Sequence, residues 1–141
     1  MSKKRSEVAE NLKWRLTDIF KDQKEFDDLL ESISKRVDFS AYEGKLDDEK
    51  TLLKCLKEMD EVEAILEKLD VYAYMKKDLD ARDSESNALL TRVENVIISY
   101  SSSTSFITPE ITSIPDEKLK KIIVNPDFKD YDYMLKNLLK S

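Results

Sequence analysis

Glycine occurs only once in this chain of 141 residues, at position 44, and proline occurs three times. Tight turns depend on these residue types, so the count argues against a β-sandwich, a β-barrel and a glycine-rich phosphate loop. It also excludes a collagen-like chain. Charged residues make up 38% of the chain and apolar residues 40%, a balance typical of amphipathic helices with one face in water. The sequence therefore predicts an all-α fold.

The longest predicted helix covers residues 48–79, with Asp47 or Asp48 as its N-cap. Its apolar side chains recur every three or four residues, close to a heptad seam, at Leu52, Leu56, Met59, Val62, Leu66, Leu69 and Tyr72 or Ala73. So long a helix needs a partner of similar length. The next apolar stripe predicts one over residues 84–112, with Asp83 or Ser84 as its cap. We therefore expect a long antiparallel helical hairpin.

Shorter elements precede this hairpin. Residues 1–13 carry no periodicity and are expected to form a mobile lead-in, with structure beginning near Trp14. Asp22 and Glu25 have the spacing of a capping box. They predict a first helix that fades over residues 39–44, where Gly44 enters a positive φ without steric cost.

Two short helices are predicted after the hairpin. Pro115 is expected at the first position of one helix, which stops at Asn125 because Pro126 disfavours helix in the residue before it. Residues 131–139 predict a last amphipathic helix, with no stop signal after it. We expect residues 14–141 to form a single helical domain, with the first helix and the C-terminal helices packed across the hairpin. The expected core residues are Leu56, Met59, Leu66, Leu69, Leu89, Val93, Ile97 and Phe106.

Charge and residue types exclude several functions. The chain has 24 basic and 30 acidic residues, a net charge of -6, so we expect no nucleic acid and no membrane partner. Histidine is absent, which removes His-dependent zinc hydrolysis and both Ser-His-Asp and Cys-His catalysis. The longest aliphatic run is Val96-Ile97-Ile98, and no secretory signal is visible. We expect a cytoplasmic protein.

No residue pattern indicates catalysis or metal binding. The run from Asp78 to Asp83 fails as a calcium loop, because the required Gly and Glu positions hold Asp83 and Leu89. Cys55 is the only cysteine, so no internal disulfide is expected, and it is interpreted as a small core residue. The remaining acidic pairs, Asp27-Asp28, Asp47-Asp48 and Glu61 with Glu63, are interpreted as solvated helix faces.

Tyrosines near the helix ends are the candidate contact residues. A tyrosine ring packs against a partner while its hydroxyl stays satisfied, so tyrosine suits half-buried surfaces. Two interpretations stay open for these side chains: packing in or at the edge of the core, or a contact with another domain. The residues are Tyr72, Tyr74, Tyr131 and Tyr133. On a helix, Tyr72 and Tyr74 point to different faces.

Five short segments stand in order along the chain: Trp14-x-Leu16-x-Asp18-Ile19-Phe20, Tyr42-x-Gly44-Lys45-Leu46, Leu69-x-x-Tyr72-Ala73-Tyr74-Met75-x-x-Asp78-x-Asp80, Ala88-Leu89-x-x-Arg92 and Ser105-Phe106-x-x-Pro109-Glu110-Ile111. As an ordered set they resemble the N-terminal domain of oligoendopeptidase F, a zinc metallopeptidase of the thimet-oligopeptidase superfamily. The resemblance covers nearly all of residues 14–139. It implies an all-α domain that precedes a larger helical catalytic domain.

The resemblance also implies a role. In that family an HExxH segment holds the zinc, and this chain has no histidine, so no catalytic, metal or substrate-binding residue is carried over. The implied function is a non-catalytic domain that helps to wall the peptide channel and supports the catalytic domain. The chain would be a fragment, either an excised domain or a naturally truncated product.

This interpretation implies binding partners for the chain, and one alternative function stays open. The expected partners are the missing catalytic domain and, for the isolated chain, further copies of itself. No cofactor is expected in this chain, and zinc is expected only in the parent enzyme. The alternative is a free-standing helical adaptor whose hairpin binds a helix of another protein.

Overall fold

The computed structural model describes residues 16–79 and 84–140. This part of the chain contains helices and no strand, as the sequence predicts. After a short helical stretch over residues 16–19, the elements are α2 (Gln23–Ser34), η1 (Ser40–Tyr42), α3 (Glu49–Leu79), α4 (Ser84–Ser103), α5 (Ile107–Thr112), α6 (Asp116–Val124), η2 (Pro126–Tyr131) and α7 (Asp132–Lys140). The expected lead-in over residues 1–13, Trp14 and Asp83 lie outside the described residues. No helix in the described ranges is long and apolar enough to cross a bilayer.

The residues group into two compact units. The first unit combines the described residues up to Val37 with residues 62–99, and the second combines residues 38–61 with the residues from Tyr100 onward. Helix α3 thus contributes its N-terminal part to the second unit and its C-terminal part to the first, and α4 lies almost wholly in the first.

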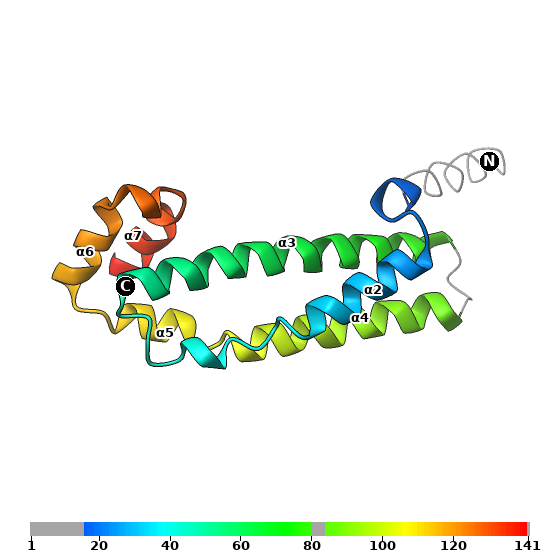
Figure 1. Ribbon diagram of the computed structural model, residues 1–141, viewed down its shortest axis with the longest axis horizontal. Helices are drawn as coiled ribbons and strands as arrows, with labels where there is room; N and C mark the ends of the chain where they lie inside the picture. The colour runs from blue at the N-terminus through cyan, green and yellow to red at the C-terminus, as the bar shows by residue number, and fades with distance from the viewer. Residues whose placement is uncertain (1–15, 80–83, 141) are drawn as a thin grey trace. The chain divides into compact units, whose positions relative to one another are not determined.

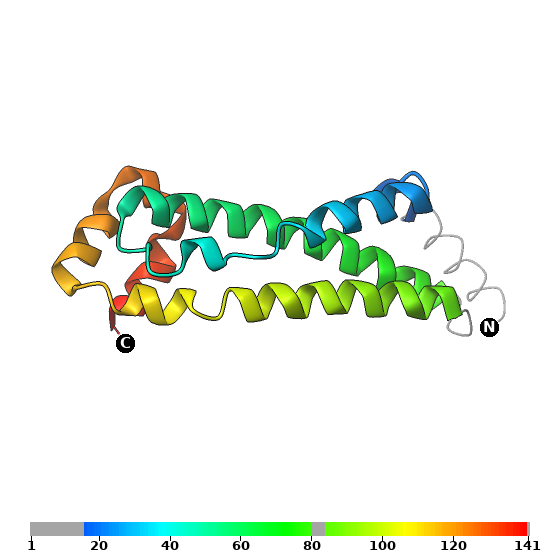
Figure 2. The same cartoon turned by 60° about the horizontal axis from the view of Figure 1, so that its bottom comes forward.

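The first unit is a layer of helices around an aromatic cluster. Its part of α3 runs antiparallel to α4, and α2 crosses them (Figures 1 and 2). The ring of Phe26, which is fully buried, stacks on Tyr72 at 4.9 Å between centroids. Phe20 meets both rings edge-on, at 5.6 Å from Phe26 and 5.0 Å from Tyr72. Such pairs contribute beyond the area they bury, so this cluster holds α2 onto α3.

Helix α2 begins where the capping pattern predicts it and ends earlier than expected. The Asp22 carboxylate accepts from the backbone N–H of Glu25 at 2.9 Å. The helix ends at Ser34, and the predicted fade over residues 39–44 is wrong. The Asp38 carboxylate accepts from the Ser40 N–H at 2.9 Å, a local bond that competes with helix, and the next turn is the separate 3-10 helix η1. Gly44 does have a positive φ, of 80°.

Helix α3 matches the predicted range of 48–79 within one residue. Its N-cap is Asp48, because the Asp48 carboxylate accepts from the N–H of Thr51 at 3.1 Å and from its hydroxyl at 2.7 Å. These bonds to Thr51 hold the pKa of Asp48 below its usual value. Asp48 therefore satisfies one of the backbone donors that a helix start leaves without a partner.

Replacing Asp48 by alanine is expected to lower the urea concentration at the midpoint of unfolding, because the first turn of α3 loses its capping acceptor. The measurement is urea unfolding followed by circular dichroism. Asp47→Ala is the matched control, since Asp47 is the exposed neighbour and makes no capping bond. Equal losses from the two substitutions would contradict the assignment of Asp48 as the cap.

The predicted helix over residues 84–112 is wrong in one respect, because α4 ends at Ser103 and α5 begins at Ile107. In the break, the Thr104 hydroxyl donates to the Tyr100 carbonyl at 2.9 Å. Such side chains offer the backbone carbonyls local partners and weaken a helix. Pro109 accounts for the restart. It has no N–H, and its ring would clash with a carbonyl one turn earlier in a continuous helix, whereas the first turn of α5 tolerates it.

The second unit contains α5, α6, η2 and α7, with α6 and α5 both packed on α7. Helix α6 ends at Val124 and Asn125 is extended, as Pro126 predicts. Pro115 stands one residue earlier than expected, at the N-cap, because its ψ of 139° is not helical. The Asn125 side chain accepts from the Asp127 N–H at 3.0 Å and donates to Glu49 at 2.5 Å, which ties η2 to the start of α3.

The core differs in part from the predicted set. Leu56, Leu66, Leu69, Leu89 and Val93 are buried as expected. Met59, Ile97 and Phe106 are only half-buried. The physical reason for Phe106 is the helix break, which removes it from the stripe of α4. The largest fully buried side chains come mainly from other segments: Phe26, Phe39, Phe128, Ile33, Leu46, Leu52, Leu69, Ile111, Leu119, Ile122, Leu135 and Val62.

Candidate functional site

The tyrosines singled out by the sequence fall in different environments. Tyr72 is 4% exposed and its ring belongs to the aromatic cluster of the first unit. Burial raises the pKa of Tyr72, and the carboxylates of Asp27 and Asp22 add to the shift. Tyr74, two residues later, is 46% exposed. Core packing therefore holds for Tyr72, and Tyr74 points to the other face, as the helical spacing predicts.

The second pair of tyrosines lies in the second unit. The Tyr131 hydroxyl donates to the Asp60 carboxylate at 2.7 Å. Burial, and then this bond to Asp60, raise the pKa of Tyr131. Tyr133 is 78% exposed. An inter-domain contact by these tyrosines stays a prediction, for which Tyr74 and Tyr133 offer the free ring surface.

Cys55 is fully buried in the second unit, as a core residue should be. Burial raises the pKa of its thiol to about 11, and the charges of Glu58 and Glu110 act in the same direction. A neutral buried thiol is a poor nucleophile and a poor metal ligand. Within the described ranges, no group of three or more His, Cys, Asp or Glu side chains is placed to hold a metal ion.

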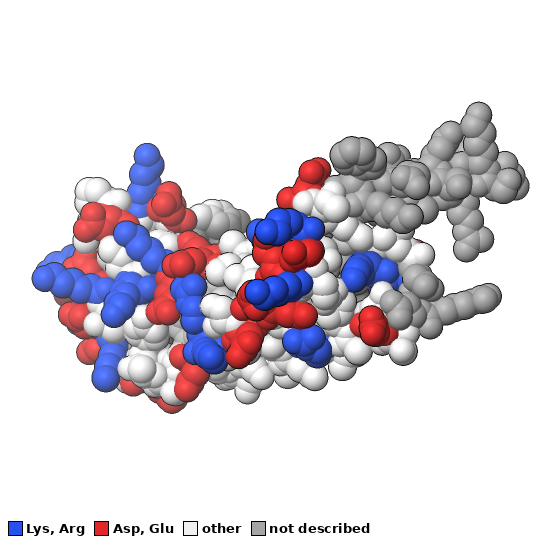
Figure 3. All heavy atoms as spheres, turned by 45° about the vertical axis from the view of Figure 1, so that its right-hand side comes forward, with Lys and Arg blue, Asp and Glu red and all other residues white. Residues whose placement is uncertain are grey.

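The face of the molecule in Figure 3 carries both signs of charge. Lysine and arginine side chains lie among aspartates and glutamates and do not gather into a basic patch. Such mixing is typical of solvated helix surfaces.

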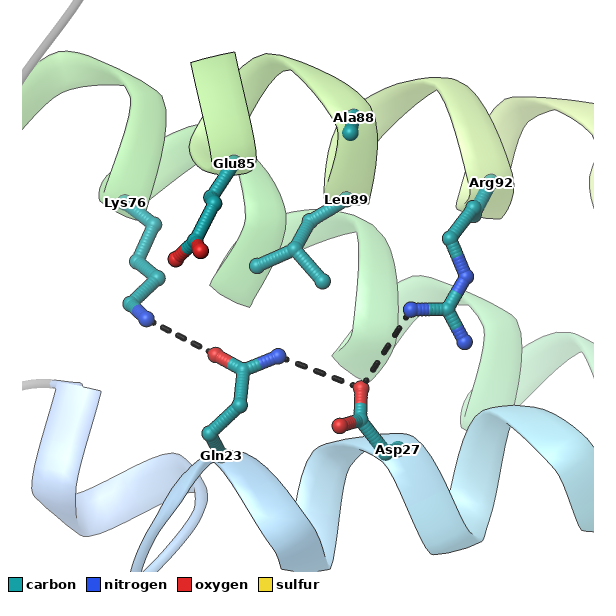
Figure 4. Close-up of a pocket in the computed structure, with 7 residues that line it drawn as sticks. All are labelled: Gln23, Asp27, Lys76, Glu85, Ala88, Leu89 and Arg92. Atoms are coloured by element: carbon teal, nitrogen blue, oxygen red, sulfur yellow. Dashed lines mark hydrogen bonds and ion pairs between the residues drawn. The ribbon is translucent and has the colours of Figure 1, made fainter. Parts of the chain in front are cut away.

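A pocket of about 300 Å³ opens in the first unit among α2, α3 and α4. Figure 4 shows the side chains that line it: Gln23, Asp27, Lys76, Glu85, Ala88, Leu89 and Arg92. Leu89 is buried and forms an apolar floor, while the polar side chains reach in from all three helices. Small-ligand sites combine these features, an apolar wall with a few placed polar groups.

Hydrogen bonds connect the three helices along one side of the pocket. Lys76 donates to the Gln23 side-chain oxygen at 2.8 Å, and Gln23 donates to Asp27 at 3.1 Å. The Arg92 guanidinium contacts the same Asp27 oxygen at 3.4 Å. The network thus presents charged groups of both signs at fixed places around an apolar floor (Figure 4).

The sequence alone does not predict this pocket. In the sequence, Asp27 belongs to an acidic pair and Arg92 to a segment that resembles oligoendopeptidase F. Gln23 and Asp27 are 4 residues apart and share a helix face, a signal that the sequence does contain. Arg92 is 65 residues from Asp27, so no local pattern could join them.

Comparison with known proteins relates the chain to one group of peptidases. No family model matches the sequence. It is 31% identical over 139 residues to oligopeptidase PepF of Bacillus subtilis, covering 96% of this chain. It is also 31% identical over 143 residues to the chromosomal oligoendopeptidase F of Lactococcus lactis, covering 98% of this chain. The chain matches the N-terminal part of oligoendopeptidase F.

The match covers only a small part of the length of these two relatives. The chain spans 21% of the length of the Bacillus protein and 24% of the Lactococcus protein. A crystal structure of a Chlamydophila abortus protein assigned to the peptidases has the same fold, with a TM-score of 0.79 and 23% identity. That likeness covers 89% of this chain and 22% of the other.

Two of the segments that resemble oligoendopeptidase F contribute residues to features described above. Tyr72 lies in the segment on α3 and belongs to the aromatic cluster. Ala88, Leu89 and Arg92 form the segment on α4, and all of them line the pocket. The similarity therefore includes both the core of the first unit and one wall of its pocket.

Proposed function

We propose that this chain works as the non-catalytic N-terminal domain of an oligoendopeptidase F-like zinc metallopeptidase. In this role it helps to wall the peptide-binding channel and supports the catalytic domain. The observation that supports the proposal is the difference in coverage. The match covers 96% of this chain but only 21% of the Bacillus relative. Most of such a peptidase, including its catalytic domain, would then lie outside these 141 residues.

The residues of this chain do not fit a zinc site. A thimet-type centre would need histidine ligands, and the sequence has none. The described side chains form no alternative cluster of ligands. In the proposed arrangement the zinc and the general base belong to the catalytic domain of the parent enzyme, in the cytoplasm, and no step of hydrolysis is assigned to this chain.

Exposed apolar side chains support a contact with another domain. In the first unit these are Val71, Tyr74 and Ile98, at 43%, 46% and 64% exposure. In the second unit they are Val124, Tyr133 and Met134. Contiguous exposed apolar patches mark interaction surfaces. Val71 and Tyr74 are three residues apart on α3 and so share one helix face. The proposed partner is the catalytic domain, and without it the isolated chain is proposed to self-associate, which sedimentation over a range of concentrations tests.

The deciding experiment pairs the reading frame with an activity assay. We expect an HExxH-encoding segment in the genomic sequence that follows codon 141. We also expect no zinc-dependent cleavage of a quenched fluorescent heptapeptide by the 141-residue chain alone, and cleavage when the downstream segment is added to it. Cleavage by this chain alone would refute the proposal. A frame that stops at Ser141 with no HExxH downstream would favour the helical adaptor instead.

A further inference from the structure

The outer face of α3 in the first unit carries a solvent-facing line of side chains. Glu67, Val71, Tyr74 and Asp78 follow one another at steps of 4, 3 and 4 residues, so they lie along one side of the helix. All four are exposed, Val71 at 43% and Tyr74 at 46%, whereas Tyr72 between them in sequence is buried. We call this line the acidic stripe. It has an apolar centre and a carboxylate at each end.

The two carboxylates of the acidic stripe are available to another surface. Among the described residues, neither Glu67 nor Asp78 takes part in an ion pair. The line from Glu67 to Asp78 is about 16 Å long at 1.5 Å per residue. A short helix that carries an apolar side chain one turn away from a basic one would fit this line.

Helix α6 in the second unit presents such a surface. Val124 is 78% exposed, and Lys120 and Lys121, which precede it by 4 and 3 residues, are exposed on the side opposite the buried Ile122. Within the described ranges neither lysine takes part in an ion pair. Glu117 lies on this side as well, a further turn away from Val124. We call Lys120, Lys121 and Val124 the basic patch.

Charge and spacing match between the two surfaces. Val124 follows Lys120 by 4 residues, and Val71 follows Glu67 by 4 residues, so an ion pair and an apolar contact can form together. Helix α6 has 9 residues, about 13 Å, and so fits within the length of the stripe. Two acidic stripes facing each other would bring like charges together, which disfavours a symmetric pair. The matched arrangement is therefore head to tail, with different surfaces of two copies in contact.

We propose that copies of this chain associate head to tail, with the basic patch of one copy on the acidic stripe of the next. Lys120 pairs with Glu67, and Val124 packs on Val71. The contact involves few side chains on each copy, so it is weak and depends on concentration. Each assembly keeps one open stripe and one open patch, to which further copies add. The inference specifies the self-association proposed for the isolated chain and does not rest on the peptidase role.

The first measurement is sedimentation equilibrium of the full 141-residue chain at concentrations up to about 1 mM, in the range of weak association. At low salt the weight-average mass should rise with concentration above the 16.5 kDa of one copy. At about 0.5 M salt it should fall back, because salt screens exposed ion pairs. The mass of a single copy at every concentration would overturn the proposal, and so would an equal rise at both salt levels.

Charge reversal identifies the two surfaces. Glu67→Lys with Asp78→Lys makes the acidic stripe basic, and Lys120→Glu with Lys121→Glu makes the basic patch acidic. Each double variant alone should associate at least about tenfold more weakly than the unchanged chain, because like charges then face each other. An equimolar mixture of the two double variants should regain association, since every stripe again meets a patch of opposite charge.

Asp28→Lys with Glu31→Lys is the matched control for the reversed stripe. It changes the net charge by the same amount at exposed positions of α2, and association should stay within about twofold of the unchanged chain. Circular dichroism verifies that each variant is folded. Undiminished association of either double variant would refute the assignment, as would a mixture that associates no better than its components. The peptide-cleavage assay tests the domain function separately, so the two proposals can fail independently.

Discussion

Replacing Phe26 by alanine is expected to lower the free energy of unfolding by about 3–5 kcal/mol. The Phe26 ring is fully buried, stacks on Tyr72 at 4.9 Å and meets Phe20 edge-on at 5.6 Å. Alanine would leave a cavity between α2 and α3 and remove both ring contacts. Because a domain is stable by only about 5–15 kcal/mol, this loss should bring the first unit close to unfolding.

The measurement is urea unfolding followed by circular dichroism at 222 nm. Phe26→Leu keeps most of the volume and should cost about 1 kcal/mol, so the pair separates the cavity from the general effect of a substitution. Tyr133→Ala is the surface control. That side chain is 78% exposed, so the free energy of unfolding should change by less than about 0.5 kcal/mol. Similar losses for Phe26→Ala and Tyr133→Ala would contradict the packing described for α2.

Cys55 in the folded chain is expected to react with a thiol reagent about 200-fold more slowly at pH 8 than in the unfolded chain. The thiolate is the reactive form, and burial raises the pKa of this thiol to about 11. An unperturbed cysteine with a pKa of about 8.5 is about a quarter thiolate at pH 8, whereas a pKa near 11 leaves about a thousandth. Steric protection of the buried sulfur adds to this difference.

The rate with 5,5′-dithiobis(2-nitrobenzoate) is measured with the folded chain and again in guanidinium chloride. Because the pKa is raised, the rate in the folded state should increase about tenfold for each pH unit between 7 and 9, whereas the unfolded rate should level off near pH 9. Cys55→Ser serves as the blank, since the chain has one cysteine. Folded and unfolded rates within threefold of each other would show that Cys55 is accessible, contrary to its burial.

Local signals in the sequence determined several features of the fold. The spacing of Asp22 and Glu25 located the start of α2, and the heptad-like stripe located α3 within one residue. Pro126 located the end of α6, and the positive φ of Gly44 followed from its being the sole glycine. Each of these depends on bonds or steric clashes between residues a few positions apart, which a single sequence displays directly.

Resemblance to oligoendopeptidase F also came from the sequence, through an ordered set of short segments, and the two relatives match over 96% and 98% of this chain. The early end of α2 and the helix break at residues 104–106 were missed although their causes are local, because side-chain bonds such as Asp38 to Ser40 and Thr104 to Tyr100 compete with the helix at little difference in energy. The other features that the sequence did not determine depend on contacts between distant residues.

The pocket is the clearest case in which tertiary structure decided the outcome. Asp27 and Arg92 are 65 residues apart, and Lys76 meets Gln23 across 53 residues. Nothing in the local pattern of either helix indicates the other. Which exposed side chains of amphipathic helices meet depends on the rotation and crossing of those helices, and the packing of buried rings such as Phe26 and Tyr72 sets both. The sequence specified the helices, and only their packing assembled a site from them.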